Sequence, residues 1–281
     1  MVRANGLDFE VLEAGTGDRL ALLLHGFPEH AISWHNQIES LVALGYRVWA
    51  PNQRGYGATT RPKRVDAYRI ARLLDDVAAL IDASGARSVV LVGHDWGAAV
   101  AWFFAMRAPR PIDRLVILNV PHPAVFLNIV RRSWRQMRKS WYILAFQIPG
   151  LAERVLGMGN GSALMRVLEE SACDPSCFSS DEREVYVRQA RDPAILCAML
   201  NWYRAAARGG MAEQIALGFP AIDVPTLVLW GEEDVALAKA TTYGTERFVR
   251  DVRIVYLPGV SHWVAQEAPD RVNALLATFL A

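Results

Sequence analysis

An aspartate stands at the point where an apolar strand is predicted to turn into an apolar helix. Asp95 is flanked by Gly93 and Gly97, and small residues suit a sharp and crowded turn of this kind. Such a junction lifts its central side chain above the carboxyl edge of the sheet, where open α/β sheets bind ligands. The alternative interpretation is that Asp95 only caps the helix that follows it.

A carboxylate nucleophile at this turn indicates a particular class of substrate. When a carboxylate attacks saturated carbon it forms an alkyl ester, and water can hydrolyse that ester at the carboxyl carbon of the enzyme. A serine in the same place would form a stable ether with saturated carbon. Asp95 as the nucleophile therefore favours an alkyl electrophile, such as an epoxide or an alkyl halide, over an ester or an amide.

Hydrolysis of such an ester needs a histidine as base and an acid that orients it. Of the six histidines, His262 follows the last predicted strand and comes after the nucleophile in the chain order typical of this architecture. Asp234 ends a turn after another strand and is the preferred orienting acid. Glu232 and Glu233 directly precede it and stay open as alternatives.

Backbone N–H groups are needed to stabilise the oxyanion that hydrolysis creates on Asp95. The loop at residues 25–28 follows an early predicted strand. Enzymes with this kind of turn pair an amide from such a loop with the amide of the residue after the nucleophile, which predicts Phe27 and Trp96 as the donors. For His25 we expect a structural hydrogen bond within the loop instead of a catalytic role.

Short apolar runs alternate with helical periods and would position these residues. Nearly continuous apolar runs are typical of strands covered on both faces of a parallel sheet. The predicted strands are 20–24, 46–50, 88–92, 114–118, 226–230 and 252–257. The predicted helices are 34–44, 68–84, 97–108, 236–249 and 269–280. This alternation indicates an α/β fold with a mostly parallel, doubly wound sheet.

The alternation stops between residues 121 and 217, where helix-like stretches are broken by Pro and Gly. We interpret 121–217 as a helical cap (lid) domain inserted into a core domain that consists of 1–120 and 218–281. A basic run at 131–139 falls in this cap, and a solvated helix face is its favoured interpretation.

The composition fits a globular protein without a strongly charged partner. The chain of 281 residues is 52% hydrophobic and 21% charged, and its formal net charge is +1. No electrostatic field therefore favours nucleic acid or an anionic membrane. We find no signal peptide, membrane-spanning run, phosphate-binding loop or zinc-ligand pattern, which predicts a cytoplasmic protein that needs no metal or cofactor.

These residues resemble the motifs of the epoxide hydrolases within the α/β-hydrolase fold. In the order of that family, the motifs are His25-Gly26-Phe27-Pro28-Glu29, Arg54-Gly55-Tyr56-Gly57, Gly93-His94-Asp95-Trp96-Gly97, Gly231-Glu232-Glu233-Asp234 and Ser261-His262-Trp263. The resemblance spans nearly the whole chain. The first two motifs also occur in related dehalogenases, so they do not decide between the two activities.

Two cap segments favour the epoxide hydrolases. Trp141-Tyr142, followed by residues 146–150, and Asn201-Trp202-Tyr203-Arg204 resemble the two tyrosine segments of that family. By this resemblance, Tyr142 and Tyr203 would hold the epoxide oxygen. A tyrosine hydroxyl can donate a proton to the alkoxide that ring opening leaves, whereas a halide needs only N–H donors.

The resemblance implies that a small apolar epoxide and water become a vicinal diol through an alkyl ester on Asp95. Three tryptophans beside the proposed site residues would line an apolar pocket for the substrate: Trp96, Trp141 and Trp202. The first alternative is a haloalkane or haloacid dehalogenase with the same Asp-His-Asp triad, in which Trp96 would hold the halide. The remote alternative is a non-catalytic ligand receptor. The sequence leaves the epoxide, the attacked carbon and the oligomeric state open, a homo-oligomer included.

Overall fold

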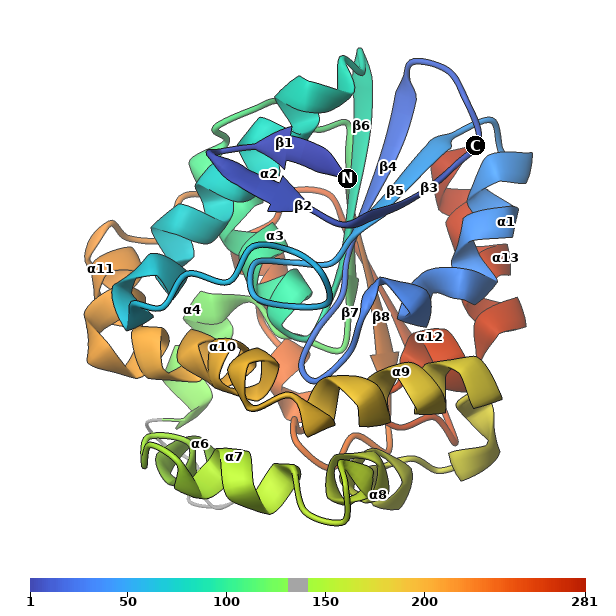
Figure 1. Ribbon diagram of the computed structural model, residues 1–281. Helices are drawn as coiled ribbons and strands as arrows, with labels where there is room; N and C mark the ends of the chain where they lie inside the picture. The colour runs from blue at the N-terminus through green and yellow to red at the C-terminus, as the bar shows by residue number, and fades with distance from the viewer. Residues whose placement is uncertain (131–140) are drawn as a thin grey trace.

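The computed structural model describes residues 1–130 and 141–281, and these fold around a seven-stranded sheet (Figure 1). In sheet order, its strands are β3 (Val11–Ala14), β5 (Arg47–Pro51), β4 (Arg19–Leu24), β6 (Ser88–His94), β7 (Arg114–Leu118), β8 (Thr226–Gly231) and β9 (Val252–Leu257). All pairs are parallel except β3 with β5. A separate hairpin pairs β1 (Val2–Ala4) with β2 (Leu7–Phe9). The predicted, mostly parallel sheet is confirmed.

The strands are apolar on both faces because helices cover both faces. In β4, Leu20, Leu22 and Leu24 belong to one buried cluster, while Ala21 and Leu23 belong to the other. The first cluster includes residues of α2 (Ile70–Ser84) and α3 (Trp96–Arg107). The second includes residues of α1 (His35–Ala43), α12 (Val264–Glu267) and α13 (Pro269–Leu280). The period-two alternation of a strand therefore divides its side chains between two cores.

The helix predicted at 236–249 is wrong. The structure has only two short 3-10 turns there, Lys239–Thr242 and Thr245–Arg247. Two causes are visible. Threonine hydroxyls hydrogen bond to nearby backbone carbonyls, as Thr241 does to Ala238, and this competes with helix formation. Gly244, with a φ of 97°, then takes a left-handed conformation that interrupts a helical path between the turns.

The described helices between β7 and β8 cross the sheet edge toward which β8 points (Figure 1). We call them the cap helices: α4 (Pro123–Val130), α6 (Trp141–Ala145), α7 (Leu151–Leu156), α8 (Ser162–Ser171), α9 (Ser180–Arg191), α10 (Pro193–Ala205) and α11 (Met211–Ala216). Short 3-10 or π turns lie at Ala31–Trp34, Val65–Tyr68, Pro175–Cys177 and Ala206–Gly210. The basic run at 131–139 lies outside the described residues.

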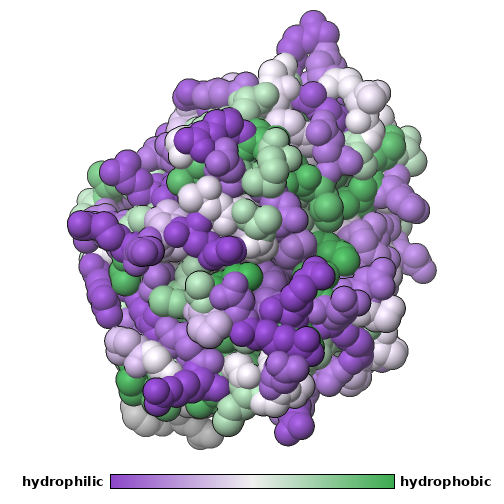
Figure 2. Space-filling model, in the orientation of Figure 1, coloured by the Kyte–Doolittle hydropathy of each residue, from purple (hydrophilic) through white to green (hydrophobic). Residues whose placement is uncertain are grey.

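The surface of the molecule is largely hydrophilic on the side seen in Figure 2, with hydrophobic residues in scattered groups. Within the part of the chain that the structure describes, no helix is both long enough and apolar enough to span a bilayer.

Candidate active site

Asp95 lies at a strained turn between β6 and α3. Its backbone has a φ of 47° and a ψ of −119°, a combination that costs energy for any residue with a side chain. The surrounding glycines make room for the turn. A Cβ at Gly97 would collide with the carbonyl oxygen of Leu24, and a Cβ at Gly26 would collide with the Asp95 side chain. The Asp95 carboxylate makes no capping hydrogen bond to α3, so the interpretation of Asp95 as a mere helix cap does not describe this geometry.

The two carboxylate oxygens of Asp95 face different groups. The N–H of Phe27 donates a hydrogen bond of 2.8 Å to Oδ1. Oδ2 lies 3.6 Å from Nε2 of His262. Trp96 is the first residue of α3, and first-turn N–H groups have no acceptor within their own helix. The Asp95 side chain keeps 21% of its surface exposed to solvent.

His262 is held by Asp234 and not by either neighbouring glutamate. Nδ1 of His262 lies 2.7 Å from Oδ2 of Asp234, and both side chains are buried. Oδ1 of Asp234 accepts hydrogen bonds from the N–H groups of Ala236 and Leu237, at 2.7 and 2.8 Å. Glu232 instead pairs with Lys239. The carboxylate of Asp234 is thus anchored by backbone on one oxygen and binds the imidazole with the other.

The electrostatics of this pair favour its charged form. Burial alone would lower the pKa of His262, but the carboxylates of Asp234 and Asp95 outweigh burial and raise that pKa well above its ordinary value. Burial would likewise raise the pKa of Asp234, yet the charge and hydrogen bond of His262 hold it below its ordinary value. The two carboxylates therefore stabilise the protonated form of His262.

Asn119 is a member of this network that the sequence analysis missed. Its side-chain N–H group donates to Oδ2 of Asp234 at 2.9 Å and to the Ser261 carbonyl at 3.1 Å. Its carbonyl oxygen accepts from the N–H of Gly231 at 2.6 Å. Asn119 directly follows β7 at the same edge of the sheet and has a φ of 46°, which asparagine tolerates better than most residues. The signal in the sequence that could have identified Asn119 is a polar residue directly after an apolar strand.

A second buried pair, Glu29 and His94, was also missed. Oε2 of Glu29 lies 2.7 Å from Nδ1 of His94, and the other ring nitrogen lies 2.9 Å from the carbonyl oxygen of His262. The N–H of Gly26 and the amide of Gln266 also donate to this carboxylate, at 2.6 and 3.0 Å. Burial would raise the pKa of Glu29, but its partners, His94 foremost, lower it to about 2.

His25 has the structural contacts expected for it. Its Nδ1 lies 2.9 Å from the Gly26 carbonyl, which can only accept, so Nδ1 carries the proton. Its Nε2 accepts from the N–H of Gln53 at 3.1 Å. Burial lowers the pKa of His25 to about 4, which keeps the ring neutral and fixes the loop that carries Phe27.

The two cap tyrosines meet above Asp95 in a cluster of aromatic rings. Tyr142 of α6 and Tyr203 of α10 have ring centroids 6.2 Å apart at an interplanar angle of 78°. Tyr203 packs edge-on against Phe27 at 5.2 Å and against Trp96 at 5.0 Å. Phe146 touches both tyrosine rings, at 5.5 and 5.0 Å. Burial first, and then the charge of Asp95, raises the pKa of both hydroxyls above the ordinary value for tyrosine.

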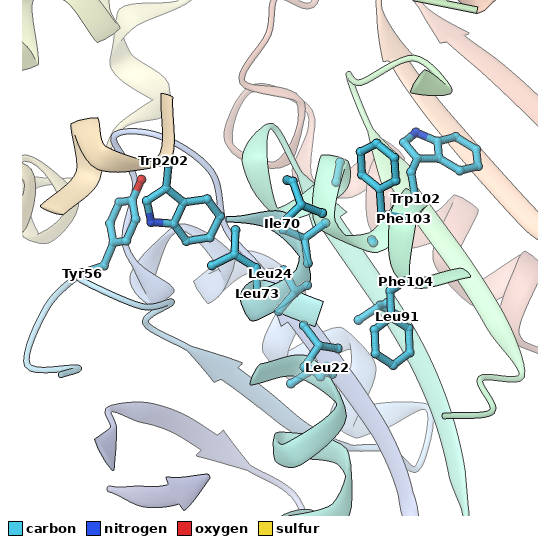
Figure 3. Close-up of a cluster of buried hydrophobic side chains, with 14 of the residues drawn as sticks. Leu22, Leu24, Tyr56, Ile70, Leu73, Leu91, Trp102, Phe103, Phe104 and Trp202 are labelled. Carbon is cyan, nitrogen blue, oxygen red and sulfur yellow. The ribbon is translucent and has the colours of Figure 1, made fainter. Parts of the chain in front are cut away.

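The predicted substrate-binding tryptophans occupy different places. Trp96 directly follows Asp95 in the chain, and its ring packs against the ring of Tyr203. Trp202 is buried beside Tyr56 (Figure 3). Its ring also packs against Trp96, and its indole N–H donates to the Arg54 carbonyl at 3.0 Å. It therefore ties α10 to the core and reaches the site through Trp96. Trp141 begins α6, and its side chain lies outside the described part of the structure.

Taken together, the arrangement brings a carboxylate, an imidazole and two phenols to one cluster of aromatic rings. Across residues 1–130 and 141–281, no three His, Cys, Asp or Glu side chains are grouped so as to hold a metal ion. The carboxylate of Asp95 can attack carbon, the imidazole of His262 can exchange a proton, and the phenols can donate hydrogen bonds.

Known proteins resemble this chain over its whole length. A family model described as alpha/beta hydrolase fold matches residues 22–160. The AB hydrolase superfamily protein YfhM of Bacillus subtilis is 38% identical, over 99% of this chain and 96% of that protein. Epoxide hydrolase A of Mycobacterium tuberculosis is 34% identical, over 100% of this chain and 96% of its own length.

Solved structures give the same result. The Bacillus megaterium epoxide hydrolase in complex with an inhibitor superposes with a TM-score of 0.90 at 27% identity, over 99% of both chains. Epoxide hydrolase A from Mycobacterium thermoresistibile superposes with a TM-score of 0.84 at 32% identity, over 99% of this chain and 96% of that one. The predicted alpha/beta hydrolase fold is confirmed.

Proposed function

This chain belongs to the epoxide hydrolase family of the alpha/beta hydrolase fold, and we propose that it adds water to an epoxide through an ester on Asp95. One observation carries the proposal. The Asp95 carboxylate is bound by a backbone N–H on one oxygen and faces the His262–Asp234 pair with the other, beside two phenol rings. A halide leaving group would need no phenol donor, whereas an epoxide oxygen does.

In the first step, Oδ2 of Asp95 attacks an epoxide carbon and the C–O bond of the ring breaks. Oδ2 is the attacking atom because Oδ1 is already engaged by the Phe27 N–H. The hydroxyls of Tyr142 and Tyr203 bind the epoxide oxygen and supply a proton to the alkoxide. The raised pKa of both tyrosines keeps these hydroxyls protonated at neutral pH, so they are present as donors.

In the second step, His262 removes a proton from water and the resulting hydroxide attacks the carboxyl carbon of the ester. The N–H groups of Phe27 and Trp96 stabilise the oxyanion on Oδ1. The ester bond then breaks, the proton on His262 passes to the leaving alcohol oxygen, and a vicinal diol is released. The second proton of the water leaves the regenerated Asp95 carboxyl and restores the tyrosine hydroxyl that protonated the alkoxide. Asp234 holds the ring of His262 in the correct orientation throughout.

Formation of the ester also prepares His262 for this second step. The negative charge of Asp95 is one of the causes that raise the pKa of His262 in the resting site. Ester formation removes that charge, so the pKa of His262 falls and the imidazole loses its proton more readily. The base therefore becomes available at the step that requires it.

We further propose that residues 121–217 act as a cap domain on a core of 1–120 and 218–281, with the substrate enclosed between them. Phe27 and Trp96 come from the core, and Tyr142, Phe146 and Tyr203 come from the cap helices and their turns. Rings from both sides form an apolar, water-poor enclosure that suits a small apolar epoxide. The cytoplasmic location stays a prediction from the sequence, and so does the option of a homo-oligomer.

A His262→Gln variant tests the proposal, because it should form the ester but fail to hydrolyse it. We expect incubation with styrene oxide to add the mass of one substrate molecule to the peptide that contains Asp95. His35→Gln is the matched control, since His35 lies at the start of α1, and it should turn over normally. An adduct with haloalkanes alone would support the dehalogenase, and the absence of any adduct or turnover would support a receptor; either would contradict the proposal.

A further inference from the structure

Arg204 is the residue after Tyr203, and it is almost completely buried in the cap. Its side chain is 3% exposed, and no catalytic step described above uses it. Its Nε donates to the Phe146 carbonyl at 3.0 Å, and its Nη1 donates to Oε1 of Glu153 at 2.8 Å. A guanidinium is a rigid planar fork, so it can bind a carbonyl and a carboxylate at once and fix their relative positions.

The carbonyl that Arg204 binds belongs to the segment that carries Tyr142. The N–H of Phe146 donates to the Tyr142 carbonyl at 2.9 Å, which closes the turn after α6. Gln147 adds a second link, because its amide donates to the Ile143 carbonyl at 3.1 Å and lies 3.4 Å from the Tyr203 carbonyl. The turn that follows one tyrosine is thereby bound to the helix that carries the other.

Glu153 anchors the arginine from a third element. It is the third residue of α7, and its Oε2 accepts from the N–H of Gly150 at 2.9 Å, so it also begins that helix. Burial would raise the pKa of Glu153, but the hydrogen bond and charge of Arg204 lower it, so the pair is ionised. Breaking one half of such a buried pair is costly, whereas removing both halves is tolerated better.

We propose that Arg204 is a positioning residue that sets the separation of the Tyr142 and Tyr203 hydroxyls by joining the turn at Phe146 to α7 and α10. This inference rests on the proposed function, in which both hydroxyls bind one epoxide oxygen. Two donors reach the same oxygen only if their positions agree to within a fraction of an ångström, because hydrogen bonds weaken steeply with distance and angle. Arg204 therefore acts on ester formation and not on ester hydrolysis.

The test measures the two steps separately, by mixing enzyme with styrene oxide, quenching with acid and following the ester on the Asp95 peptide by mass spectrometry. We expect Arg204→Met to slow ester formation by about 10- to 100-fold and to leave the rate constant of ester hydrolysis unchanged. Arg204→Lys should restore part of the rate, because a lysine can still pair with Glu153 but cannot bind both partners in one plane.

Two further variants separate positioning from general stability. The double variant Arg204→Met, Glu153→Gln leaves no unpaired buried charge, so it should fold and yet show the same slow ester formation. Arg183→Met is the matched control. Arg183 also binds both backbone carbonyls and a carboxylate, but in another part of the cap helices. Its partners are the carbonyls of Pro175 and Phe178 and the carboxylate of Glu169. It should lose stability without a change in either rate constant.

Three results would overturn the inference. Ester formation at the wild-type rate in Arg204→Met and in the double variant would show that the guanidinium does not position the hydroxyls. Equal slowing of formation and hydrolysis would show a general structural effect. A wild-type enzyme that forms no ester on Asp95 would overturn the proposed function and the inference with it, so the failures can be told apart.

Discussion

The site has two halves that are held in place by different kinds of contact. Asp95, Asp234 and His262 follow β6, β8 and β9 at the same edge of one sheet, and backbone N–H groups bind the two carboxylates directly. Tyr142 and Tyr203 come from cap helices and meet through ring edges. Strand topology and backbone hydrogen bonds therefore place Asp95, Asp234 and His262, whereas side-chain contacts within the cap helices place the two tyrosines. Changes in the first half should abolish the chemistry, and changes in the second should weaken its first step.

The largest effect is expected at the strained turn. Asp95→Gly should reduce kcat/KM by about 10⁵-fold or more, because the nucleophile is gone. The same variant should unfold at a higher temperature, because glycine adopts a φ of 47° without strain, a gain of about 1 kcal/mol. Initial rates measure the loss of kcat/KM, and thermal unfolding measures the gain in stability. A variant that loses activity and stability together would contradict the view that the turn stores strain.

The next effect concerns the cap half. Tyr142→Phe and Tyr203→Phe should each slow ester formation by about 100-fold, and the double variant by about 1,000-fold or more. Ester hydrolysis should not change, since it uses Asp95, His262 and backbone amides. Single-turnover chemical quench measures both steps. Near-normal turnover of an epoxide by the double variant would remove the tyrosines from the mechanism.

Glu29 should contribute a pH-dependent share of stability to the sheet half. Its pKa is lowered from 4.5 to about 2 in the folded protein, so its contribution is complete above pH 4.5 and is lost as the pH falls toward 2. That shift corresponds to about 3 kcal/mol. The unfolding free energy of the wild type should exceed that of Glu29→Gln at neutral pH, and the two should converge in acid. A constant difference across that range would refute this assignment.

The smallest effect is expected where the cap helices meet the core. Trp202→Phe removes the indole N–H that binds the Arg54 carbonyl and should cost about 2 kcal/mol of unfolding free energy. Ester hydrolysis should be unaffected, because Trp202 touches neither Asp95 nor His262 in its ring contacts. Denaturant unfolding and single-turnover decay give the two values. A selective loss of ester hydrolysis would mean that the two halves are coupled.

The sequence predicts the sheet half well because strand order and chain order constrain it. Every predicted strand overlaps an observed one, and the residues that follow β6, β8 and β9 do come together at one edge. The chain could not show which of three consecutive acids would reach His262, since that depends on the path of one loop. The failed helix at 236–249 has a local cause in its threonines and Gly244.

The buried partners of the site were beyond sequence reasoning for a different reason. Asn119, Glu29 and His94 act through contacts with residues far along the chain, and each reads locally as an ordinary loop or strand-end residue. The same holds for Arg204, whose partner Glu153 lies in another helix. Composition and periodicity describe one segment at a time, so they cannot show which buried polar groups satisfy each other.

Asp95 forms a covalent ester in the proposed mechanism, and a single turnover in heavy-oxygen water can detect that ester through its oxygen atoms. With enzyme in excess over styrene oxide, the oxygen given to the diol comes from Asp95, and the water oxygen replaces it in the carboxylate. We expect one heavy oxygen in the peptide that contains Asp95 and an unlabelled diol. A labelled diol with an unlabelled Asp95 would show direct attack by water and would refute the covalent mechanism.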